Sequence, residues 1–356
     1  MMNQFAHGGD IFSLDETNRD RLLDFSVNIN PLGMSPMGLS ALSDFFSREA
    51  GRYPDIECRE LKKVLSDYYK IPVYCISCGN GATELMYVLM RVLRPSSVYV
   101  PDPCFSEYEK AADAENIPVY SYALDGTRNF CVKDWSFIEA IPKKSVIYAG
   151  NPNNPDGRFL VKDDFLRLAK AAARTDSWLI LDESFVDFSE SDVSYRSCIS
   201  QNPHLIIVTS LTKFFAVPGL RIGYTFSSPE IAEKISSALY PWNVNGPVQL
   251  YIKAALSDKK YIAESRRYVQ EERKRFCHML EKLSAIQLFP GTVNFILLRL
   301  TNGHDAAWMQ EKLLPHGFLI RQCGNYKGLD NTYFRLAIRK QDENDKLFQV
   351  LSEILS

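Results

Sequence analysis

The sequence predicts an α/β protein with a mostly parallel central sheet, helices on both faces of that sheet, and a smaller α+β unit. The length of 356 residues is sufficient for one large and one small folded unit. From about residue 80 to residue 226, short apolar runs rich in Val, Ile and Tyr alternate with amphipathic stretches. This alternation is typical of a sheet that is buried on both faces. Beyond residue 228 the pattern changes to long helices followed by short strands.

Six apolar runs predict the strands of the large sheet: Val98–Pro101, Pro118–Tyr122, Val146–Ala149, Trp178–Leu181, Leu205–Thr209 and Ile222–Phe226. Three amphipathic stretches between them predict helices over Glu84–Leu93, Ser106–Glu115 and Phe165–Ala173. The strands are short and mostly apolar, which indicates burial on both faces rather than on one.

The C-terminal part of the chain predicts long helices over residues 228–284, interrupted near Pro241 and Pro247. Strands over Val293–Leu300 and Tyr333–Ile338 follow, with helices over residues 305–314 and 341–355. The first 50 residues contain extended segments with frequent Pro and Gly, which we expect to fold back onto this part. These patterns divide the chain into an N-terminal arm over residues 1–45, a large unit over residues 46–245 and a small unit over residues 246–356.

Composition excludes several functional classes. Apolar residues make up 46% and charged residues 24% of the chain, as in ordinary globular proteins. The formal net charge of −2 leaves no global basic field for nucleic acid. No apolar run approaches the roughly 18 residues that a membrane span needs. The N-terminal MMNQFAHGGDIF has neither the basic n-region nor the apolar h-region of a signal peptide. We therefore expect a cytoplasmic protein without a membrane or nucleic-acid partner.

The cysteines and histidines do not predict a metal site. Eight Cys are scattered along a chain without a secretion signal, so free thiols are expected rather than a disulfide framework. Cys75 and Cys78 form a single C-x-x-C pair, whereas a zinc site would need a second pair. The five His are dispersed and show no ligand spacing.

Polar residues gather in the loops that follow the predicted strands, where open α/β sheets bind ligands. Gly79-Asn80-Gly81 opens a predicted helix, so its backbone N–H groups are able to approach an anion. Asn151-Pro152-Asn153-Asn154-Pro155 follows the predicted strand Val146–Ala149, and its two prolines fix the loop that presents the amides. Both features also occur in ordinary turns, so neither is specific alone.

Three charged residues extend this pattern. Asp182 ends an apolar strand, Lys213 lies among Phe214, Phe215 and Val217, and Arg221 follows a Pro-Gly turn. An amine in apolar surroundings has the lowered pKa that a Schiff-base lysine needs. A phosphorylated pyridine aldehyde requires such a set, because its phosphate needs amides, a hydroxyl and a cation, its ring nitrogen an acid and its aldehyde an amine.

The motifs G-N-G, N-P-N-N-P, D-E-x-F, S-L-T-K-F and P-G-L-R-I-G resemble those of the fold-type-I pyridoxal-phosphate enzymes, the aspartate aminotransferase superfamily, in order and spacing. The resemblance covers nearly the whole chain. It implies a mixed, mostly parallel sheet with a smaller α+β domain, and pyridoxal 5'-phosphate as cofactor. It implies Lys213 as the Schiff-base lysine and Asp182 as the partner of the ring nitrogen. The other cofactor residues that it implies are Gly81, Ala82, Ser210 and Arg221 at the phosphate, Asn154 at the phenolate oxygen, Tyr108 stacked on the ring and Tyr53 from a partner subunit.

Within this superfamily, the N-terminal arm is similar to the L-threonine-O-3-phosphate decarboxylases of cobalamin biosynthesis. The arm carries His7-Gly8-Gly9 and the string from Asp24 to Gly33, and Pro-Trp-x-Val-Asn follows at residues 241–245. Histidinol-phosphate aminotransferases share the later core but commonly lack H-G-G in this form. They also commonly carry Tyr three residues after the ring-nitrogen Asp, where this chain has Phe185; a neutral packing exchange would explain that difference equally well.

This resemblance implies the decarboxylation of L-threonine O-3-phosphate to (R)-1-amino-2-propanol O-2-phosphate. It places the substrate phosphate near His7, Gly8, Asn30 and Arg321, and the carboxylate near Asn154 and Arg335. Arg suits both anions because its planar fork binds them bidentately. Asp10, Asp156 and Ser184 depart from the family pattern, so L-serine O-phosphate stays open as the substrate.

Two other functions remain open from the sequence. One is an aminotransferase that acts on histidinol phosphate, and the other is a pyridoxal-phosphate-fold sensor domain. The sensor domain is disfavoured because the chain has neither an added helix-turn-helix segment nor a basic face. Tyr53 and the arm are useful only if they reach a neighbouring site, so we expect a homodimer.

Overall fold

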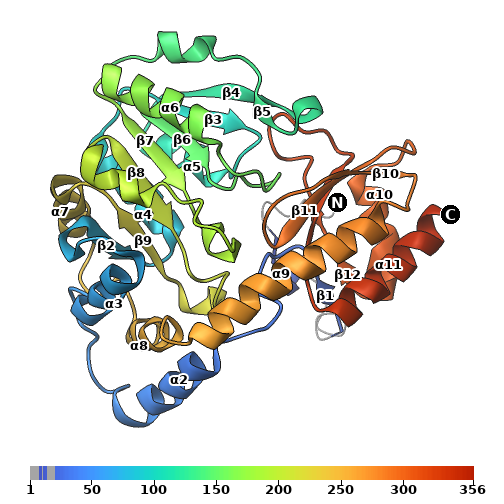
Figure 1. Ribbon diagram of the computed structural model, residues 1–356, viewed down its shortest axis with the longest axis horizontal. Helices are drawn as coiled ribbons and strands as arrows, with labels where there is room; N and C mark the ends of the chain where they lie inside the picture. The colour runs from blue at the N-terminus through green and yellow to red at the C-terminus, as the bar shows by residue number, and fades with distance from the viewer. Residues whose placement is uncertain (1–7, 10, 14–20) are drawn as a thin grey trace.

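The computed structural model describes residues 8–9, 11–13 and 21–356, and His7 and Asp10 lie outside these residues. Its two larger sheets differ in size, and a long helix, α9, runs between the units that they form (Figure 1). The fold-type-I architecture that the motifs imply is confirmed: a large mixed sheet with helices, and a smaller antiparallel sheet.

The large sheet has eight strands in the order β2-β9-β8-β7-β6-β3-β4-β5. Strands β8, β7, β6, β3 and β4 run parallel to one another, whereas β9 is antiparallel to β2 and β8, and β5 is antiparallel to β4. The strands are β2 (Ile76–Gly79), β3 (Val98–Asp102), β4 (Val119–Asp125), β5 (Cys131–Val132), β6 (Val146–Gly150), β7 (Trp178–Asp182), β8 (Leu205–Thr209) and β9 (Gly223–Phe226).

Successive residues of the central strands enter different cores, because side chains alternate across a sheet. In β7, Leu179 and Leu181 pack into the core on one face, whereas Ile180 packs into the core on the other. The helices that cover the two faces and the rim of this sheet are α3 (Arg59–Tyr69), α4 (Ala82–Leu93), α5 (Glu107–Asp113), α6 (Lys162–Arg174) and α7 (Pro229–Ala238). Burial on both faces explains why these strands read as continuous apolar runs.

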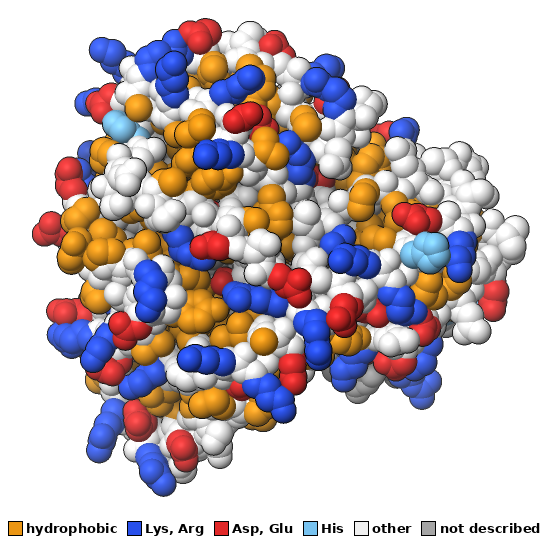
Figure 2. Space-filling view, viewed as in Figure 1, with side chains coloured by type: hydrophobic (Ala, Val, Ile, Leu, Met, Phe, Trp, Pro, Cys, Tyr) orange, Lys and Arg blue, Asp and Glu red, His pale blue; other side chains and the backbone are white. Residues whose placement is uncertain are grey.

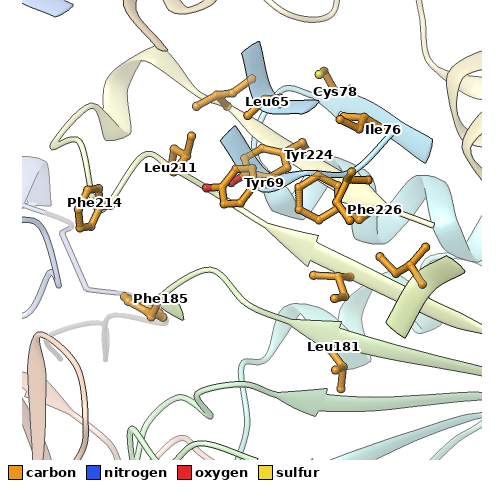
Figure 3. Packing of buried hydrophobic residues seen from close by; sticks show 14 of the residues in the cluster. Leu65, Tyr69, Ile76, Cys78, Leu181, Phe185, Leu211, Phe214, Tyr224 and Phe226 are labelled. Carbon is orange, nitrogen blue, oxygen red and sulfur yellow. The ribbon is translucent and has the colours of Figure 1, made fainter. Parts of the chain in front are cut away.

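The core on one face is rich in aromatic side chains. Figure 3 shows Tyr69, Tyr224 and Phe226 packed together, with Phe185 and Phe214 lying further along the same cluster toward the strand ends. The Tyr224 hydroxyl donates a hydrogen bond of 2.6 Å to the Tyr69 hydroxyl, which satisfies two polar groups inside this core. The apolar cluster therefore reaches the loops that follow the strands.

The small unit is built on an antiparallel sheet in the order β10-β11-β14-β13. Its elements are β10 (Ile286–Phe289), β11 (Phe295–Leu300), β13 (Arg321–Gln322), β14 (Tyr333–Ala337), α10 (Ala306–Leu313) and α11 (Gln341–Leu355). The N-terminal arm joins this unit through β1 (Leu23–Asp24), which pairs in parallel with β12 (Phe318–Leu319).

The packing changes from the large to the small unit along α9 (Lys259–Leu280), not at residue 246. Tyr261 and Val269 of α9 pack into the large core, whereas Phe276 and Leu280 pack into the small one. Helices α2 (Pro36–Arg48) and α8 (Gly246–Ala255) pack on each other beside the large sheet, although the sequence-based division assigns most of α2 to the arm and all of α8 to the small unit.

Local chemistry explains where the helices around Pro247 begin. Asn245 caps α8 by accepting a hydrogen bond of 3.0 Å from the Val248 N–H, and Pro247 lies in the first turn, where a missing N–H has no cost. Asp258 caps α9 in the same way through the Tyr261 N–H. None of the described helices is long and apolar enough to span a membrane.

Candidate active site

The predicted cofactor residues lie at one edge of the large sheet, where its parallel strands end. Asn154 follows β6, Asp182 is the last residue of β7, and Lys213 follows β8. Gly81 follows β2 and caps α4. Because parallel strands end at the same edge of a sheet, loops that are far apart in sequence converge here.

Lys213 is half-buried in a turn among aromatic side chains, and its Nζ lies 5.2 Å from the centroid of the Phe185 ring. Burial lowers the pKa of Lys213, the nearby Asp182 carboxylate opposes this shift, and the Arg221 and Arg335 guanidinium groups add to it. A lowered pKa increases the share of neutral amine, which is the nucleophilic form.

Asn30 braces the Lys213 turn from the arm. Its backbone N–H donates to the Lys213 carbonyl at 3.0 Å. Its side-chain Nδ2 donates to the carbonyl of Phe214 at 2.7 Å, and the hydroxyls of Tyr261 and Ser265 on α9 lie 3.0 and 2.8 Å from the same nitrogen. The resemblance implies Asn30 as a ligand of the substrate phosphate, and that role stays a prediction. The hydrogen bonds of its side-chain nitrogen go to Phe214, Tyr261 and Ser265 within the protein.

Asp182 is held by two donors. Its Oδ1 accepts from the Ser184 N–H at 2.9 Å and its Oδ2 from the Tyr108 hydroxyl at 2.8 Å. The Tyr108 ring stacks on Tyr148, with centroids 4.5 Å apart and planes inclined by 1°. Burial, with a contribution from Asp182, raises the pKa of Tyr108 well above its usual value, so the hydroxyl stays a donor. Tyr108 thus lies beside Asp182, and its stacking on a cofactor ring stays a prediction.

The four predicted phosphate ligands converge at the N-terminus of α4. Gly81 has φ +91°, and a Cβ added there would lie 2.4 Å from Nη2 of Arg221. A Cβ on Gly223 would lie 2.3 Å from the Ala82 nitrogen, so β9 approaches the helix as closely as glycine allows. Ser210 is tied to the same strand because its hydroxyl donates to the Ile222 carbonyl at 2.8 Å. A helix N-terminus, a hydroxyl and a guanidinium together fit a phosphate.

These residues fit pyridoxal phosphate. Gly81, Ala82, Ser210 and Arg221 would hold its phosphate, Asp182 its ring nitrogen and Lys213 its aldehyde. No group of three or more metal-ligating side chains is present among the described residues.

A second cluster of charge faces this edge from the small sheet. Arg321 on β13 and Arg335 on β14 are direct cross-strand neighbours, and both are 5% exposed. Arg335 donates to the Asn154 Oδ1 through Nη1 and to the Ser26 carbonyl at 3.2 Å through Nη2. Arg321 donates to Asn325 Oδ1 at 2.9 Å and lies over the Tyr326 ring. The structure thus brings the three predicted residues Asn154, Arg321 and Arg335 together.

The arm reaches the same cluster. The Gly9 N–H donates to the Ser26 hydroxyl at 2.9 Å, and a Cβ on Gly8 would lie 2.2 Å from the Ser26 carbonyl oxygen. Gly8 therefore lies beside the carbonyl that Arg335 contacts. Tyr53 is elsewhere: its side chain is 81% exposed and stacks on Trp242 at 4.7 Å.

Sequence reasoning missed Asn28, two residues before Asn30. Asn28 is 5% exposed, and no donor among the described residues reaches its Oδ1. The N-x-N spacing was the available signal, because residues i and i+2 of an extended segment point to the same side. With Asn30 turned to α9, Asn28 is the amide left with an acceptor to offer to a ligand.

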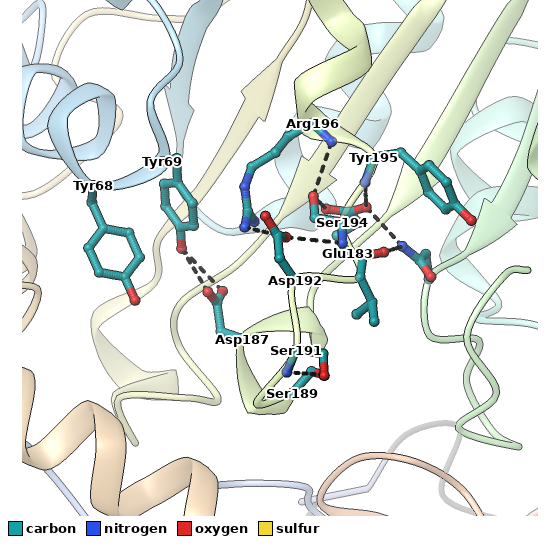
Figure 4. Close-up of polar contacts among 12 residues, drawn as sticks. Tyr68, Tyr69, Glu183, Asp187, Ser189, Ser191, Asp192, Ser194, Tyr195 and Arg196 are labelled. Carbon is teal, nitrogen blue, oxygen red and sulfur yellow. Dashed lines mark hydrogen bonds and ion pairs between the residues drawn. The ribbon is translucent and has the colours of Figure 1, made fainter. Parts of the chain in front are cut away.

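Sequence reasoning also missed Glu183, which binds Asn151 at the start of the loop that carries Asn154. Glu183 is 1% exposed and accepts hydrogen bonds from Asn151 Nδ2 at 2.9 Å, from the Tyr195 N–H at 3.1 Å and from the Ser194 hydroxyl (Figure 4). Burial raises the pKa of Glu183 to about 7 despite these donors. In Figure 4 the Asp187 carboxylate accepts from the Tyr69 hydroxyl in a second, separate contact.

Comparison with known proteins agrees with this geometry. The family "Aminotransferase class I and II" matches residues 20–351. The threonine-phosphate decarboxylase of Salmonella typhimurium is 33% identical over 99% of this chain and 97% of its own. The adenosylcobalamin biosynthesis bifunctional protein of Leptospira interrogans is 32% identical over 99% of this chain and 41% of its own. The crystal structure of the histidinol-phosphate aminotransferase from Clostridium acetobutylicum has a TM-score of 0.87 and 33% identity, covering 94% of this chain and 99% of that one.

Replacing the amine of Lys213 should abolish covalent capture of the cofactor. After borohydride reduction and denaturation, we expect wild-type protein to carry the added mass of pyridoxal phosphate on the peptide that contains Lys213, and Lys213→Ala to carry none. Lys327→Ala, at an exposed site paired with Glu109, is the control. A Lys213→Ala variant that still retains reduced cofactor on another lysine would show that Lys213 is not the reacting amine.

Removing the Asn30 side chain should cost stability. Asn30→Ala leaves buried acceptors on Phe214 and Tyr261 without their donor, at roughly 1–3 kcal/mol for each unsatisfied group. We expect a lower midpoint in urea unfolding with an unchanged slope, and no such shift for Asn302→Ala on the surface. Normal stability combined with weak substrate binding would instead support Asn30 as a phosphate ligand.

Proposed function

The chain belongs to the class I and II aminotransferase family, and on that premise we propose that it is a decarboxylase of L-threonine O-3-phosphate. The product is (R)-1-amino-2-propanol O-2-phosphate, which serves cobalamin biosynthesis. The identities with a threonine-phosphate decarboxylase and with a cobalamin-biosynthesis protein support this assignment. The cofactor is pyridoxal phosphate, which the family uses and which the residues around Lys213 fit.

The observation that carries the proposal is the pair Arg321 and Arg335. Like charges directly opposite each other on neighbouring strands repel, and both side chains are buried where water screens them poorly. Among the described residues no carboxylate is within ion-pair distance of Arg335. A substrate that carries a carboxylate and a phosphate offsets both charges, because a guanidinium binds either anion through paired hydrogen bonds.

The surroundings of the two arginines support the α-carboxylate as the ligand of Arg335 and the phosphate as the ligand of Arg321. Arg335 is bonded to Asn154, whose loop also borders the cofactor residues, so this pair takes the α-carboxylate. Arg321 lines a cavity of about 100 Å³ together with Ser106, Asn325 and Lys327, which offer hydrogen-bond donors and a second cation to the phosphate-bearing end of the substrate; the carboxylates of Asp102 and Glu109 border the same cavity. Gly8 lies beside the Ser26 carbonyl that Arg335 contacts, and Asn28 adds a buried amide oxygen that has no partner among the described residues.

The bound cofactor supplies an electron sink for the bond that breaks at the substrate Cα. Asp182 keeps the proton on the ring nitrogen, and Tyr108 and Ser184 hold the carboxylate of Asp182 in place. Arg335 and Asn154 fix the direction of the substrate carboxylate, which decides whether carbon dioxide or a proton leaves. Lys213 would then give a proton to Cα, and its lowered pKa makes its ammonium form a stronger proton donor.

A second candidate, an aminotransferase that acts on histidinol phosphate, is favoured by the structural similarity to such an enzyme at the same 33% identity. The overall fold therefore does not distinguish the two reactions. Phe185 favours the decarboxylase, because its ring faces Lys213 and packs edge-on against Phe295 at 5.1 Å without a hydroxyl for the cofactor. L-Serine O-phosphate, which lacks one methyl group, is the alternative substrate within the decarboxylase assignment.

We also propose that the protein is a homodimer, with a second copy of this chain covering the surface around Tyr53. Several apolar side chains there are exposed: Phe46, Tyr53 and Trp242. In Figure 2 apolar side chains reach the surface among charged ones over the lower left, where Figure 1 places α2, α3 and α8. In a dimer with two-fold symmetry, one such face covers the same face of the other copy.

If Arg321 binds the phosphate and Arg335 the carboxylate, their alanine variants should affect phosphothreonine and threonine differently. Losing a charged hydrogen bond to a desolvated anion costs roughly 2–4 kcal/mol, or about 30- to 1000-fold in rate. Arg321→Ala should reduce carbon dioxide release from phosphothreonine by that factor and leave any slow reaction of threonine unchanged, whereas Arg335→Ala should reduce both. Arg299→Ala, on the outer part of the same small sheet, is the control.

The same assay decides between the reactions. Wild-type protein that forms a keto acid with 2-oxoglutarate and releases no carbon dioxide from phosphothreonine or phosphoserine would replace the decarboxylase with the aminotransferase. Equal losses with both substrates in Arg321→Ala would mean that Arg321 does not bind the phosphate.

Tyr53→Phe should weaken cofactor retention while the protein stays dimeric, because only the hydroxyl that reaches the partner's cofactor is lost. Dialysis followed by absorbance measures retention, and light scattering measures the mass. Tyr74→Phe, at another exposed tyrosine, should change neither. An active monomer in solution would contradict the dimer.

A further inference from the structure

Two cysteines that are 20 residues apart in sequence meet beside the phosphate cradle. Cys78 is on β2, directly before Gly79-Asn80-Gly81, and Cys58 caps the N-terminus of α3. Each is 4% exposed, and the two side chains share a hydrogen bond. Both line a cavity of about 230 Å³ that also borders Lys62 and Tyr240. The cavity is large enough for water or a small solute to reach both sulfur atoms.

The surroundings make the two thiols unequal. The hydrogen bond from Cys78 lowers the pKa of Cys58, and Lys62 lowers it further, although burial opposes both. The same hydrogen bond and burial raise the pKa of Cys78 well above its usual value. Cys58 is the N-cap residue of α3, which places it at the positive end of that helix dipole. Cys58 is therefore the nucleophilic thiolate of the pair and Cys78 the protonated partner.

The other cysteines lack this arrangement. Burial raises the pKa of Cys75, and it raises the pKa of Cys277 and of Cys323 to about 11. Of the thiols whose pKa departs from its ordinary value, Cys58 alone has a lowered one. Cys58 is thus the sulfur that an oxidant attacks first if it enters the cavity.

We propose that Cys58 and Cys78 form a redox-sensitive pair that a small peroxide converts to a disulfide, and that this disulfide loosens the cofactor's phosphate cradle. In the first step the Cys58 thiolate attacks hydrogen peroxide, the O–O bond breaks, and Cys58 becomes a sulfenic acid while the released hydroxide takes a proton to form water. In the second step the Cys78 sulfur attacks the Cys58 sulfur, its proton leaves with the hydroxyl group as a second water, and the S–S bond forms. Two thiols are oxidised and one peroxide is reduced.

A short chain of hydrogen bonds connects Cys78 to the cradle. Asn243 donates through Nδ2 to the Cys78 carbonyl at 3.3 Å and to Oε2 of Glu84 at 3.0 Å. The same Glu84 oxygen accepts from the Asn80 N–H at 2.6 Å, which fixes the turn that leads into Gly81. Because an S–S bond of about 2.05 Å is shorter than the contact between two thiols, its formation draws the end of β2 toward α3 and shifts this turn.

The pair is tested by mapping disulfides in the full-length protein with its cofactor bound. After hydrogen peroxide treatment and alkylation, trypsin releases residues 53–59 with Cys58 and residues 71–91 with both Cys75 and Cys78. We expect these peptides to be joined, with fragment ions that place the link on Cys78, and dithiothreitol to separate them. Cys58 oxidised without a link, or linked to Cys75, would overturn the proposal.

Two variants add a matched comparison. Cys78→Ser should lose the link, whereas Cys75→Ser, which removes a buried thiol three residues away, should keep it. The wild-type map does not depend on how either variant folds.

Cofactor retention tests the regulatory half separately. Peroxide should increase the fraction of pyridoxal phosphate lost on dialysis from wild-type protein and from Cys75→Ser, but not from Cys78→Ser, and dithiothreitol should restore retention. A disulfide that forms without any change in retention would overturn the link to the cradle. Neither measurement uses the reaction itself, so the outcome is independent of whether the enzyme is a decarboxylase or an aminotransferase.

Discussion

The pairing of β7 with both of its neighbours is the constraint on which the site depends. Asp182 is the last residue of β7 and lies opposite Gly150 of β6 and Val208 of β8. The ladder continues past the strand end, because the Asn151 N–H donates to the Asp182 carbonyl and the Glu183 N–H to the Val208 carbonyl, both at 2.8 Å. Three loops therefore leave the sheet in fixed register. The distances from the ring-nitrogen acid to the lysine and to the Asn154 loop follow from that register rather than from contacts between the loops themselves.

The large and small units contribute different things to the site. In the large unit, the two acids beside the cofactor residues are fully paired within the protein: Asp182 accepts from two donors and Glu183 from three. On the small unit and the arm, Arg335 keeps an unpartnered Nε and Asn28 an unpartnered Oδ1 among the described residues. Unsatisfied buried groups cost stability and are most useful where a ligand supplies the missing partners. The large unit thus holds the cofactor residues rigidly, and the small unit and arm retain binding capacity for the substrate.

Much of the fold follows from the sequence because its strongest signals are local. The central strands are apolar along their length, so β8 has the predicted bounds Leu205–Thr209, and α11 has the predicted bounds 341–355. Strands such as β12 and β13 have only two residues, too few for any periodicity, and are formed by tertiary pairing. The site residues on strand ends were predictable from motif order. Asn28 and Glu183 were not, because which of two nearby polar residues turns inward depends on long-range partners such as Tyr261 and Tyr195.

The helix α9 gives the two units a shared mechanical element. Its 22 residues span about 33 Å at 1.5 Å per residue, a stiff rod anchored in one core at its first turns and in the other at its last. Near the first anchor it carries Tyr261 and Ser265, which contact Asn30 and through it the backbone of Lys213. Because α9 is one continuous helix, a rotation at its C-terminal end would also move the residues at its N-terminal end that contact Asn30. A movement of the small unit would therefore change the position of the Lys213 backbone through α9 and Asn30, without a flexible segment between the two units.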